Sequence, residues 1–415
     1  MPSMLQNTVL FFKNLSKSRM LFSRMLRIRF YLIVYRLVQK KDKNLTDQEM
    51  QKRISDSIRE KTGCRVAILM PGNGIGDTIV ISGLIYILKQ HACEISIVCY
   101  DRLLSVLPEI MPFVDSFIRV DKHDFFGKYL KNRKKADVVL DFANPNVNFD
   151  HHKLKSLLTL DCQNVIGFNQ DLEHSGVPIP DNPPRNFFSM IKEIYARSYT
   201  AIESRPFLSR SVTLLRDYFG IAISETDYRY HLEVPAATEN RVTAWLGEIR
   251  NRKNEKLPNG FPPRTVLINA TASTPERSLS AELINKACDY LLHCSEKYVI
   301  VLLNLGSGDL KLTSSRIVFS PFKTFAEAAM LIKHSDFVLS PDTSFVHVAS
   351  AFGKHGIFAY IKTKSELGYE NNVAWKPVHE NCLQICHEPE PGAENDLRDL
   401  KFEILKEALI SKGIV

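Results

Sequence analysis

The stretch MPGNGIGDTIVI, residues 70–81, joins an apolar run to a segment with helical spacing. The preceding residues 66–69 read Val-Ala-Ile-Leu, as a buried strand does, and apolar residues recur at helical spacing from Ile79 to Leu88. The glycines of the stretch allow a sharp turn and the close approach of another molecule. Asp77 stands in the first helical turn, where free N–H groups favour an ionised carboxylate. The sequence therefore predicts a strand, a turn and a helix whose acid either caps the helix or takes a proton from a bound hydroxyl.

The composition is that of a globular chain with two domains of ordinary size. The chain has 415 residues, of which 45% are hydrophobic and 24% are charged. Its eight cysteines are scattered, several of them inside apolar runs, as reduced core thiols are. No secretory leader with a cleavage site is evident. We therefore expect a cytoplasmic chain.

The basic character of the chain is concentrated at its start. Residues 1–45 contain ten Lys or Arg and one Asp, a net charge of +9, which leaves −1 of the total of +8 for residues 46–415. A general affinity for nucleic acid is therefore not predicted. The apolar runs of this arm are shorter than the roughly 20 residues of a transmembrane helix. A basic amphipathic helix on an anionic membrane surface is predicted, and a helix packed on the first domain is the alternative.

Short apolar runs alternate with helical segments along most of the chain, which predicts an α/β fold with parallel sheets. Two further helices are expected within residues 187–219. A proline-rich and charged stretch then interrupts the pattern, and a second α/β series begins at Thr265. The expected organisation is an arm with a helix at 1–62, a first domain at 63–240, a linker region at 241–263, a second domain at 264–393 and a C-terminal helix at 394–415.

The second domain has two candidate anion sites at strand ends, where open α/β sheets bind ligands. The first is the loop 269–277, in which Thr271, Ser273, Thr274 and Arg277 could cradle a phosphate. The second is the run 340–347, Ser-Pro-Asp-Thr-Ser-Phe-Val-His. There Asp342 or Thr343 would cap a helix with free N–H groups, and His347 follows one turn after Thr343 or Ser344. Together the two segments predict a diphosphate site.

Three blocks of the chain resemble the signatures of glycosyltransferase family 9, which contains the ADP-heptose:lipopolysaccharide heptosyltransferases. The blocks are the strand, glycine loop and helix at 66–88, the loop 269–277, and the run 336–352. Gly76-Asp77-Thr78 is similar to the end of the first signature. The segment 342–350, Asp-Thr-Ser-Phe-Val-His-Val-Ala-Ser, is similar to the third signature, Asp-Thr-Gly-x-x-His-x-Ala-Ala. The resemblance spans residues 64–410 and leaves the arm outside.

This resemblance implies a GT-B fold, with two facing Rossmann-like domains and an interdomain cleft, here preceded by the basic N-terminal helical arm. It implies an inverting, metal-independent transfer from a nucleotide-diphosphate sugar, with no other cofactor and with ADP-heptose as the family's default donor. Asp77 would be the general base, and the acceptor-side loop would comprise Gly72, Asn73, Gly74 and Gly76. The donor and phosphate site would comprise Thr271, Ser273, Thr274, Arg277, Asp309, Asp342, Thr343, Ser344 and His347.

Two departures from the signatures leave the sugar and the nucleotide open. Arg277 stands where the family usually has Lys, which keeps the charge but changes its geometry. Ser344 stands in place of Gly, which adds a side chain where a phosphate would come close.

The resemblance also implies the partners: a nucleotide-sugar donor and a lipid-linked or core oligosaccharide acceptor of the lipopolysaccharide type. Together with the basic arm at 1–45, it favours a peripheral position on the inner face of the inner membrane. A catalytically inactive relative that acts as a membrane-associated scaffold is one alternative. A nucleotide-cofactor oxidoreductase is another, although the glycines at 72, 74 and 76 lack the Gly-x-Gly-x-x-Gly spacing.

Overall fold

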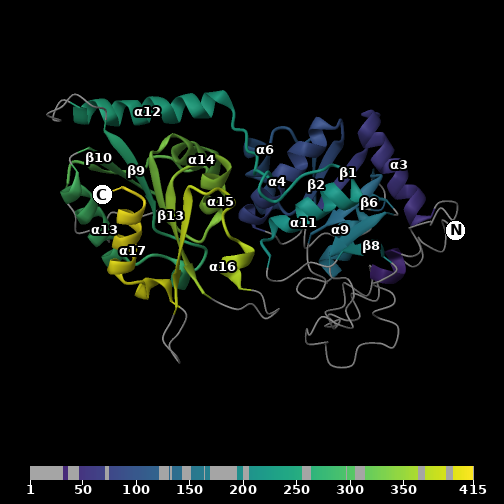
Figure 1. The fold of residues 1–415 in the computed structure, drawn as a ribbon. Coiled ribbons are helices and arrows are strands. Elements are labelled where there is room, and N and C mark those ends of the chain that lie inside the picture. Colours follow the sequence, from purple (N-terminus) through teal and green to yellow (C-terminus); the bar gives the residue numbers. More distant parts are fainter. Residues whose placement is uncertain are drawn as a thin grey trace, which may run out of the picture.

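The computed structural model of the chain describes residues 31–35, 46–70, 74–120, 130, 133–142, 151–162, 164–168, 194–199, 205–254, 263–295, 297–303, 314–362, 370–388 and 396–414. It contains two parallel six-stranded sheets, one in each half of the chain, and Figure 1 shows the two halves side by side with helices on the faces of each sheet. The mixed α/β class with parallel sheets, predicted from the sequence, is confirmed.

The first sheet has the strand order β3-β2-β1-β5-β7-β8, and all five neighbouring pairs are parallel. Its strands are β1 (Arg65–Leu69), β2 (Glu94–Cys99), β3 (Ser116–Arg119), β5 (Val138–Asp141), β7 (Val165–Phe168) and β8 (Tyr195–Tyr199). Counted along the chain, this is the 3-2-1-4-5-6 order of a Rossmann sheet, which reverses between β1 and β5. The short pair β4 (Lys134–Lys135) and β6 (Leu160–Asp161) forms a separate ribbon.

The second sheet repeats the same topology with the order β11-β10-β9-β12-β13-β14. Its strands are β9 (Arg264–Asn269), β10 (Tyr298–Leu303), β11 (Ile317–Phe319), β12 (Phe337–Pro341), β13 (Gly356–Ile361) and β14 (Cys382–His387). The order reverses between β9 and β12, and every residue of β10 and β12 is buried. Such continuous apolar runs are typical of parallel strands covered on both faces.

Helices connect and cover the strands of both sheets. In the first half they are α3 (Asp47–Glu60), α4 (Ile75–Gln90), α5 (Asp101–Leu104), α6 (Leu107–Ile110), α9 (His151–Leu158), α11 (Leu208–Thr213) and a π-helical turn at Leu214–Tyr218. In the second half they are α12 (Ala236–Asn254), α13 (Ala281–Cys294), α14 (Phe325–His334), α15 (Ser344–Ala351), α16 (Asn371–Ala374) and α17 (Phe402–Ser411), with short 3-10 turns at Pro275–Arg277 and Leu397–Asp399. The helices α4 and α15 pack against each other, so one hydrophobic cluster continues from the first sheet into the second.

One segment departs from the stated expectation. Residues 195–199 form β8 beside β7, so the prediction of helix throughout residues 187–219 is wrong there. The segment Tyr-Ala-Arg-Ser-Tyr has aromatic residues at both ends, and pairing with a neighbouring strand decides the conformation of so short a piece.

The described part of the N-terminal arm packs on the first domain. Residues 31–35 are helical, and Leu32, Val34 and Tyr35 are buried against a cluster that includes Leu69 of β1. The rest of the arm, residues 1–30 and 36–45, lies outside the described residues. The next helix, α3, begins with a capping box, in which Thr46 and Glu49 bond each other's backbone N–H groups.

Residues 220–235, called the strap below, lead from the first half of the chain to helix α12 of the second. The strap crosses α4, where the Tyr228 hydroxyl donates to Val80 O (2.9 Å) and accepts from Leu84 N (3.0 Å), and His231 N donates to Ser82 Oγ (2.8 Å). Helix α12 follows and packs on α14. The linker region expected at 241–263 therefore includes most of α12, and residues 255–262 lie outside the described residues.

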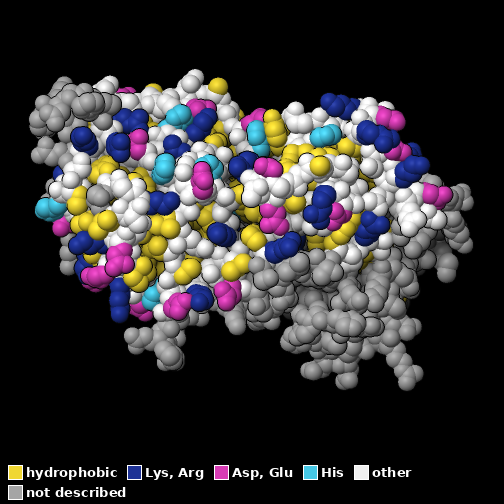
Figure 2. Space-filling model, viewed as in Figure 1, with side chains coloured by type: hydrophobic (Ala, Val, Ile, Leu, Met, Phe, Trp, Pro, Cys, Tyr) yellow, Lys and Arg dark blue, Asp and Glu magenta, His cyan; other side chains and the backbone are white. Residues whose placement is uncertain are grey.

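The described surface carries charges of both signs. On the face in Figure 2, Lys and Arg side chains alternate with Asp and Glu over both halves, as the net charge of −1 for residues 46–415 leads one to expect. Among the helices of the described residues, none is both long enough and apolar enough to cross a membrane.

Gly83 is the point at which the strap lies on α4, and this contact can be tested. A Cβ at Gly83 would lie 2.1 Å from Arg229 O and 2.8 Å from Tyr228 Cζ. We expect Gly83→Ala to lower the free energy of unfolding by about 1–3 kcal/mol or more, because backbone would have to move. The matched control is Gly247→Ala on α12, where a Cβ meets nothing within 4 Å. It should raise stability by up to about 1 kcal/mol. Urea unfolding of both variants measures the contrast, and equal stabilities would contradict the position of the strap.

Candidate functional site

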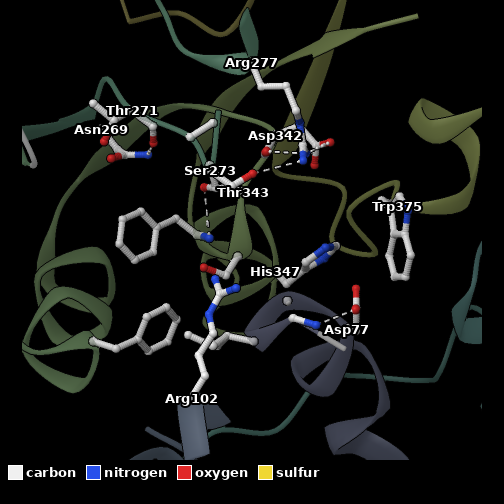
Figure 3. A pocket seen from close by; sticks show the side chains of 17 residues that line it. Asp77, Arg102, Asn269, Thr271, Ser273, Arg277, Asp342, Thr343, His347 and Trp375 are labelled. Atoms are coloured by element: carbon white, nitrogen blue, oxygen red, sulfur yellow. Dashed lines mark hydrogen bonds and ion pairs between the residues drawn. The ribbon is translucent and has the colours of Figure 1, made fainter. Parts of the chain in front are cut away.

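A cavity of about 400 Å³ lies between the two domains, at the carboxyl ends of their strands. Figure 3 shows its walls: α4 and α5 of the first domain lie on one side, and the loop after β9 and the start of α15 lie on the other. The lining residues are Gly74, Ile75, Gly76, Asp77, Arg102, Asn269, Thr271, Ala272, Ser273, Arg277, Phe325, Asp342, Thr343, Ser344, Phe345, His347 and Trp375. The cavity therefore joins the switch points of both sheets.

Asp77 is held at the start of α4 by its own helix. Its Oδ2 accepts a hydrogen bond from Gly74 N at 2.7 Å, which closes a capping arrangement. Burial raises the pKa of this carboxyl, the Gly74 N–H opposes the rise, and the nearby Asp342 carboxylate adds to it. Asp77 thus caps its helix and also faces the cavity, and a carboxylate with a raised pKa is a better proton acceptor than an ordinary aspartate.

Gly76 lets the two domains touch at the edge of the cavity. A Cβ on Gly76 would lie 3.2 Å from His347 Cδ2 and 3.4 Å from Ser344 Cα, both on α15. A larger residue would therefore push the helix starts of the two domains apart. Gly76 is the second residue of α4 and has no positive φ, so it is needed for contact with the other domain and not for the turn that the sequence predicted.

The opposite wall is built from two loops that are tied together behind the cavity. Asn269, the last residue of β9, is buried, and its Nδ2 donates to Ser340 Oγ on β12 and to Thr271 O, both at 3.0 Å. Ser278 Oγ accepts from Ala272 N at 2.9 Å and closes the base of the loop. These bonds fix the positions of Thr271 and Ser273, whose side chains are exposed to the cavity.

Arg277 is paired within this wall. Its Nη2 donates to Asp342 Oδ2 at 2.7 Å and to Asp342 O at 2.9 Å, and its Nη1 lies 3.4 Å from Ser273 Oγ. Burial raises the pKa of Asp342, and the guanidinium opposes that rise. The pair positions the turn before α15, and most of the charge of Arg277 is compensated by Asp342.

At the start of α15, the backbone N–H of Ser344 has no hydrogen-bond partner among the described residues. Thr343 is the N-cap and its hydroxyl accepts from Phe345 N at 3.3 Å, while Ser344 is the first helical residue. An anion at this end would be stabilised by the helix dipole.

His347 lies one turn into α15 and is almost completely buried, with 3% of its surface exposed. The ring stands edge-on to Tyr230 and Trp375, with centroids 5.7 and 6.3 Å away. Its Nδ1 has no hydrogen-bond partner among the described residues. Burial lowers the pKa of His347 to about 4, so the ring is neutral at physiological pH.

Most of the predicted site residues meet in this cavity. Asp77, the glycines 74 and 76, and Thr271, Ser273, Arg277, Asp342, Thr343, Ser344 and His347 all line it. Thr274 lies in the same loop but does not line it. Gly72, Asn73 and Asp309 lie outside the described residues.

Three lining residues, Arg102, Phe325 and Trp375, lie outside the segments in which the sequence predicted the site. Four more lie inside those segments but were not predicted to take part: Ile75, Asn269, Ala272 and Phe345. Arg102 follows the end of β2 by three residues, and its position at a strand end was a signal that could have been used. Trp375 stacks on Phe207 of the first domain with centroids 4.8 Å apart, a contact that no local pattern reveals. Within the described residues, no group of three or more His, Cys, Asp or Glu side chains is placed to hold a metal ion.

No family model matches the chain. A segment of 204 residues is 25% identical to "putative lipopolysaccharide heptosyltransferase 4" of Escherichia coli (strain K12), covering 49% of this chain and 52% of that protein. The resemblance to glycosyltransferase family 9 is confirmed. The chain spans about half the length of this curated relative.

Three solved structures share the fold. A family 9 glycosyl transferase from Veillonella parvula DSM 2008 has a TM-score of 0.59 at 15% identity, covering 84% of this chain and 97% of that one. E. coli ADP-heptose lps heptosyltransferase II gives 0.58 at 14% identity, and E. coli heptosyltransferase WaaC with ADP gives 0.57 at 13%, each covering 84% of this chain and 98% of the other. The likeness extends across both domains.

The protonation of His347 gives a test of the burial at the domain interface. The folded state holds this ring with a pKa of about 4, below the ordinary 6.5, so the unfolded chain binds the proton first as the pH falls. The contribution of His347 to stability is therefore complete above pH 6.5 and is lost as the pH drops towards 4. An NMR titration of the His347 Cε1 proton should show no protonation at pH 5.5. A midpoint near 6.5 would mean that water reaches the ring and that the domains are not packed here as described.

Proposed function

We propose that the chain is an inverting, metal-independent glycosyltransferase that moves a sugar from a nucleotide-diphosphate donor to a lipopolysaccharide or lipooligosaccharide core, or to a related envelope glycan. One observation carries the proposal: a carboxylate of one domain, Asp77, shares a cavity with a helix N-terminus of the other domain. A base and an anion site that face each other are what displacement of a diphosphate by a hydroxyl requires. Because the chain is similar to named heptosyltransferases, ADP-heptose is the first candidate donor.

The donor half of the site would lie in the second domain. The hydroxyls of Thr271 and Ser273 and the N–H groups at the start of α15 can bond phosphate oxygens. Arg277 would act mainly by ordering Asp342 and the turn before α15, with part of its charge available to the ligand. In the absence of a metal ion, these groups would have to stabilise the charge that develops on the leaving diphosphate.

The acceptor half would lie at the start of α4. In one displacement, Asp77 takes the proton of the acceptor hydroxyl, and the oxygen attacks the anomeric carbon from the face opposite the diphosphate. The bond from that carbon to the diphosphate oxygen breaks, and its electron pair leaves with the diphosphate. The anomeric configuration is inverted by this single step. Gly74 leaves room for an acceptor sugar beside the carboxylate, because a side chain there would contact only Asp77, whereas the space beside Gly76 is occupied by α15.

We also propose that the basic arm holds the protein at the inner face of the inner membrane, where a lipid-linked acceptor is available. The net charge of +9 in residues 1–45 supports contact with anionic lipids. The buried side chains of Leu32, Val34 and Tyr35 tie part of this arm to the first domain, which is the domain that would receive the acceptor.

Replacement of Asp77 separates its two roles. In Asp77→Asn the side-chain oxygen can still accept the bond from Gly74 N, whereas Asp77→Ala removes both the cap and the base. We expect both variants to lose about 10²–10⁴-fold in transfer rate, the range that a general base contributes. Only Asp77→Ala should lose the cap, at a cost of about 1 kcal/mol in stability. Nucleotide release from the donor sugar in the presence of acceptor measures the rate. Full activity of Asp77→Asn would assign the carboxylate to capping alone.

A panel of nucleoside diphosphates tests the nature of the donor. If the donor is ADP-linked, ADP should raise the melting temperature more than UDP or GDP at equal concentration, because only the bound folded state gains stability. A larger shift with UDP or GDP would exclude ADP-heptose as donor and leave the transfer reaction open.

A further inference from the structure

Arg102 brings a positive charge into the cavity from the first domain. It is the second residue of α5 and lines the cavity opposite α15. Figure 3 shows its side chain pointing across the cavity towards Thr343 and His347. Its guanidinium has no hydrogen bond or ion pair within the part of the chain that the structure describes.

The neighbouring acid does not compensate this charge. Asp101 is paired with Arg119, whose Nε lies 2.6 Å from Asp101 Oδ1 and whose Nη2 lies 2.7 Å from Asp101 Oδ2. Both carboxylate oxygens of Asp101 are therefore engaged by the arginine at the end of β3. The bidentate pair leaves the five donors of Arg102 available for a ligand.

The two arginines that line the cavity differ in what they can offer. Arg277 already donates to the side chain and the backbone of Asp342. A ligand bound by Arg277 would have to share it with that carboxylate, whereas a ligand bound by Arg102 would not. Among the lining residues, Arg102 is thus the stronger candidate for direct neutralisation of an anion.

The wall opposite Arg102 points to the same kind of ligand. At the start of α15, neither the backbone N–H of Ser344 nor the buried Nδ1 of His347 has a partner among the described residues. A buried polar atom left unbonded costs free energy, which a ligand atom that reaches it can recover. A donor from each domain would then meet on one anionic group.

We propose that Arg102 and the N-terminus of α15 together form a diphosphate site that spans the domain boundary, with His347 Nδ1 as a further contact. This proposal rests on the proposed function, and it assigns to the first domain a direct part in neutralising the leaving group. Because the anion would be held from both sides, its binding would also favour the closed arrangement of the domains, in which α4 and α15 touch.

Inorganic pyrophosphate is the probe, because it carries the diphosphate charge without a base or a sugar. Calorimetry in a buffer that contains a chelator should show binding to the full chain. Arg102→Gln should weaken that binding by about 10–100-fold, the loss expected when a charged hydrogen-bond partner is removed. Arg102→Lys should retain part of the affinity, since it keeps the charge but lacks the fork.

The matched control is Arg53→Gln, the same change at an exposed residue of α3 in the same domain that does not line the cavity. It should bind pyrophosphate as the wild type does. Equal affinities of Arg102→Gln and Arg53→Gln would overturn the proposal, and so would the absence of pyrophosphate binding to the wild type. Pyrophosphate binding can be measured without any sugar transfer. A loss of affinity in Arg102→Gln would therefore support the role of Arg102 even if no transfer were detected. Conversely, transfer without a loss of affinity in Arg102→Gln would contradict the role of Arg102 but not the proposed function.

Discussion

The structure depends on the contact between the start of α4 and the start of α15. Each helix follows a strand beside the switch point of its own sheet, and the two meet where Gly76 leaves no side chain between them. This close approach places a carboxylate from one domain beside a positive helix end from the other. A side chain at residue 76 would press on His347 and Ser344 and would have to move α15 by a few tenths of an ångström.

The two domains use the same topology for different tasks. In both, the loop after the first strand of the sheet enters the cavity, yet the first domain brings glycines and an acid while the second brings hydroxyls and an arginine. The same backbone frame therefore supplies complementary chemistry from two sides. In the second domain, Asn269 bonds Thr271 O and Ser340 Oγ behind the loop, which holds the loop in place and leaves its hydroxyl groups available to a ligand.

Much of this could be predicted from the sequence, because the decisive patterns are local. The apolar run before the glycines, the turn and Asp77 specify one strand–turn–helix unit, and Thr343 with His347 specify another. The strand at Tyr195–Tyr199 could not be recognised, because its conformation comes from pairing with β7 rather than from its own residues. Arg102 was overlooked for a related reason. Its significance lies in the pairing of Asp101 with Arg119, and that contact becomes visible only when β2 and β3 are placed side by side.

The strap over α4 has a mechanical consequence. Up to Glu233 the segment is bound to the first domain, since Glu233 N donates to Ile110 O at 3.1 Å. From Glu239 onwards it is bound to the second, since this carboxylate pairs with Lys333 and His334 of α14. The described chain passes between the domains once, so the pivot for any relative rotation is confined to a few residues around Val234 and Pro235. So short a connection favours a hinge rotation of one domain against the other over a shear motion in which the domains slide. Each domain can thus accumulate changes in its own ligand preference while the alignment of the two halves is preserved.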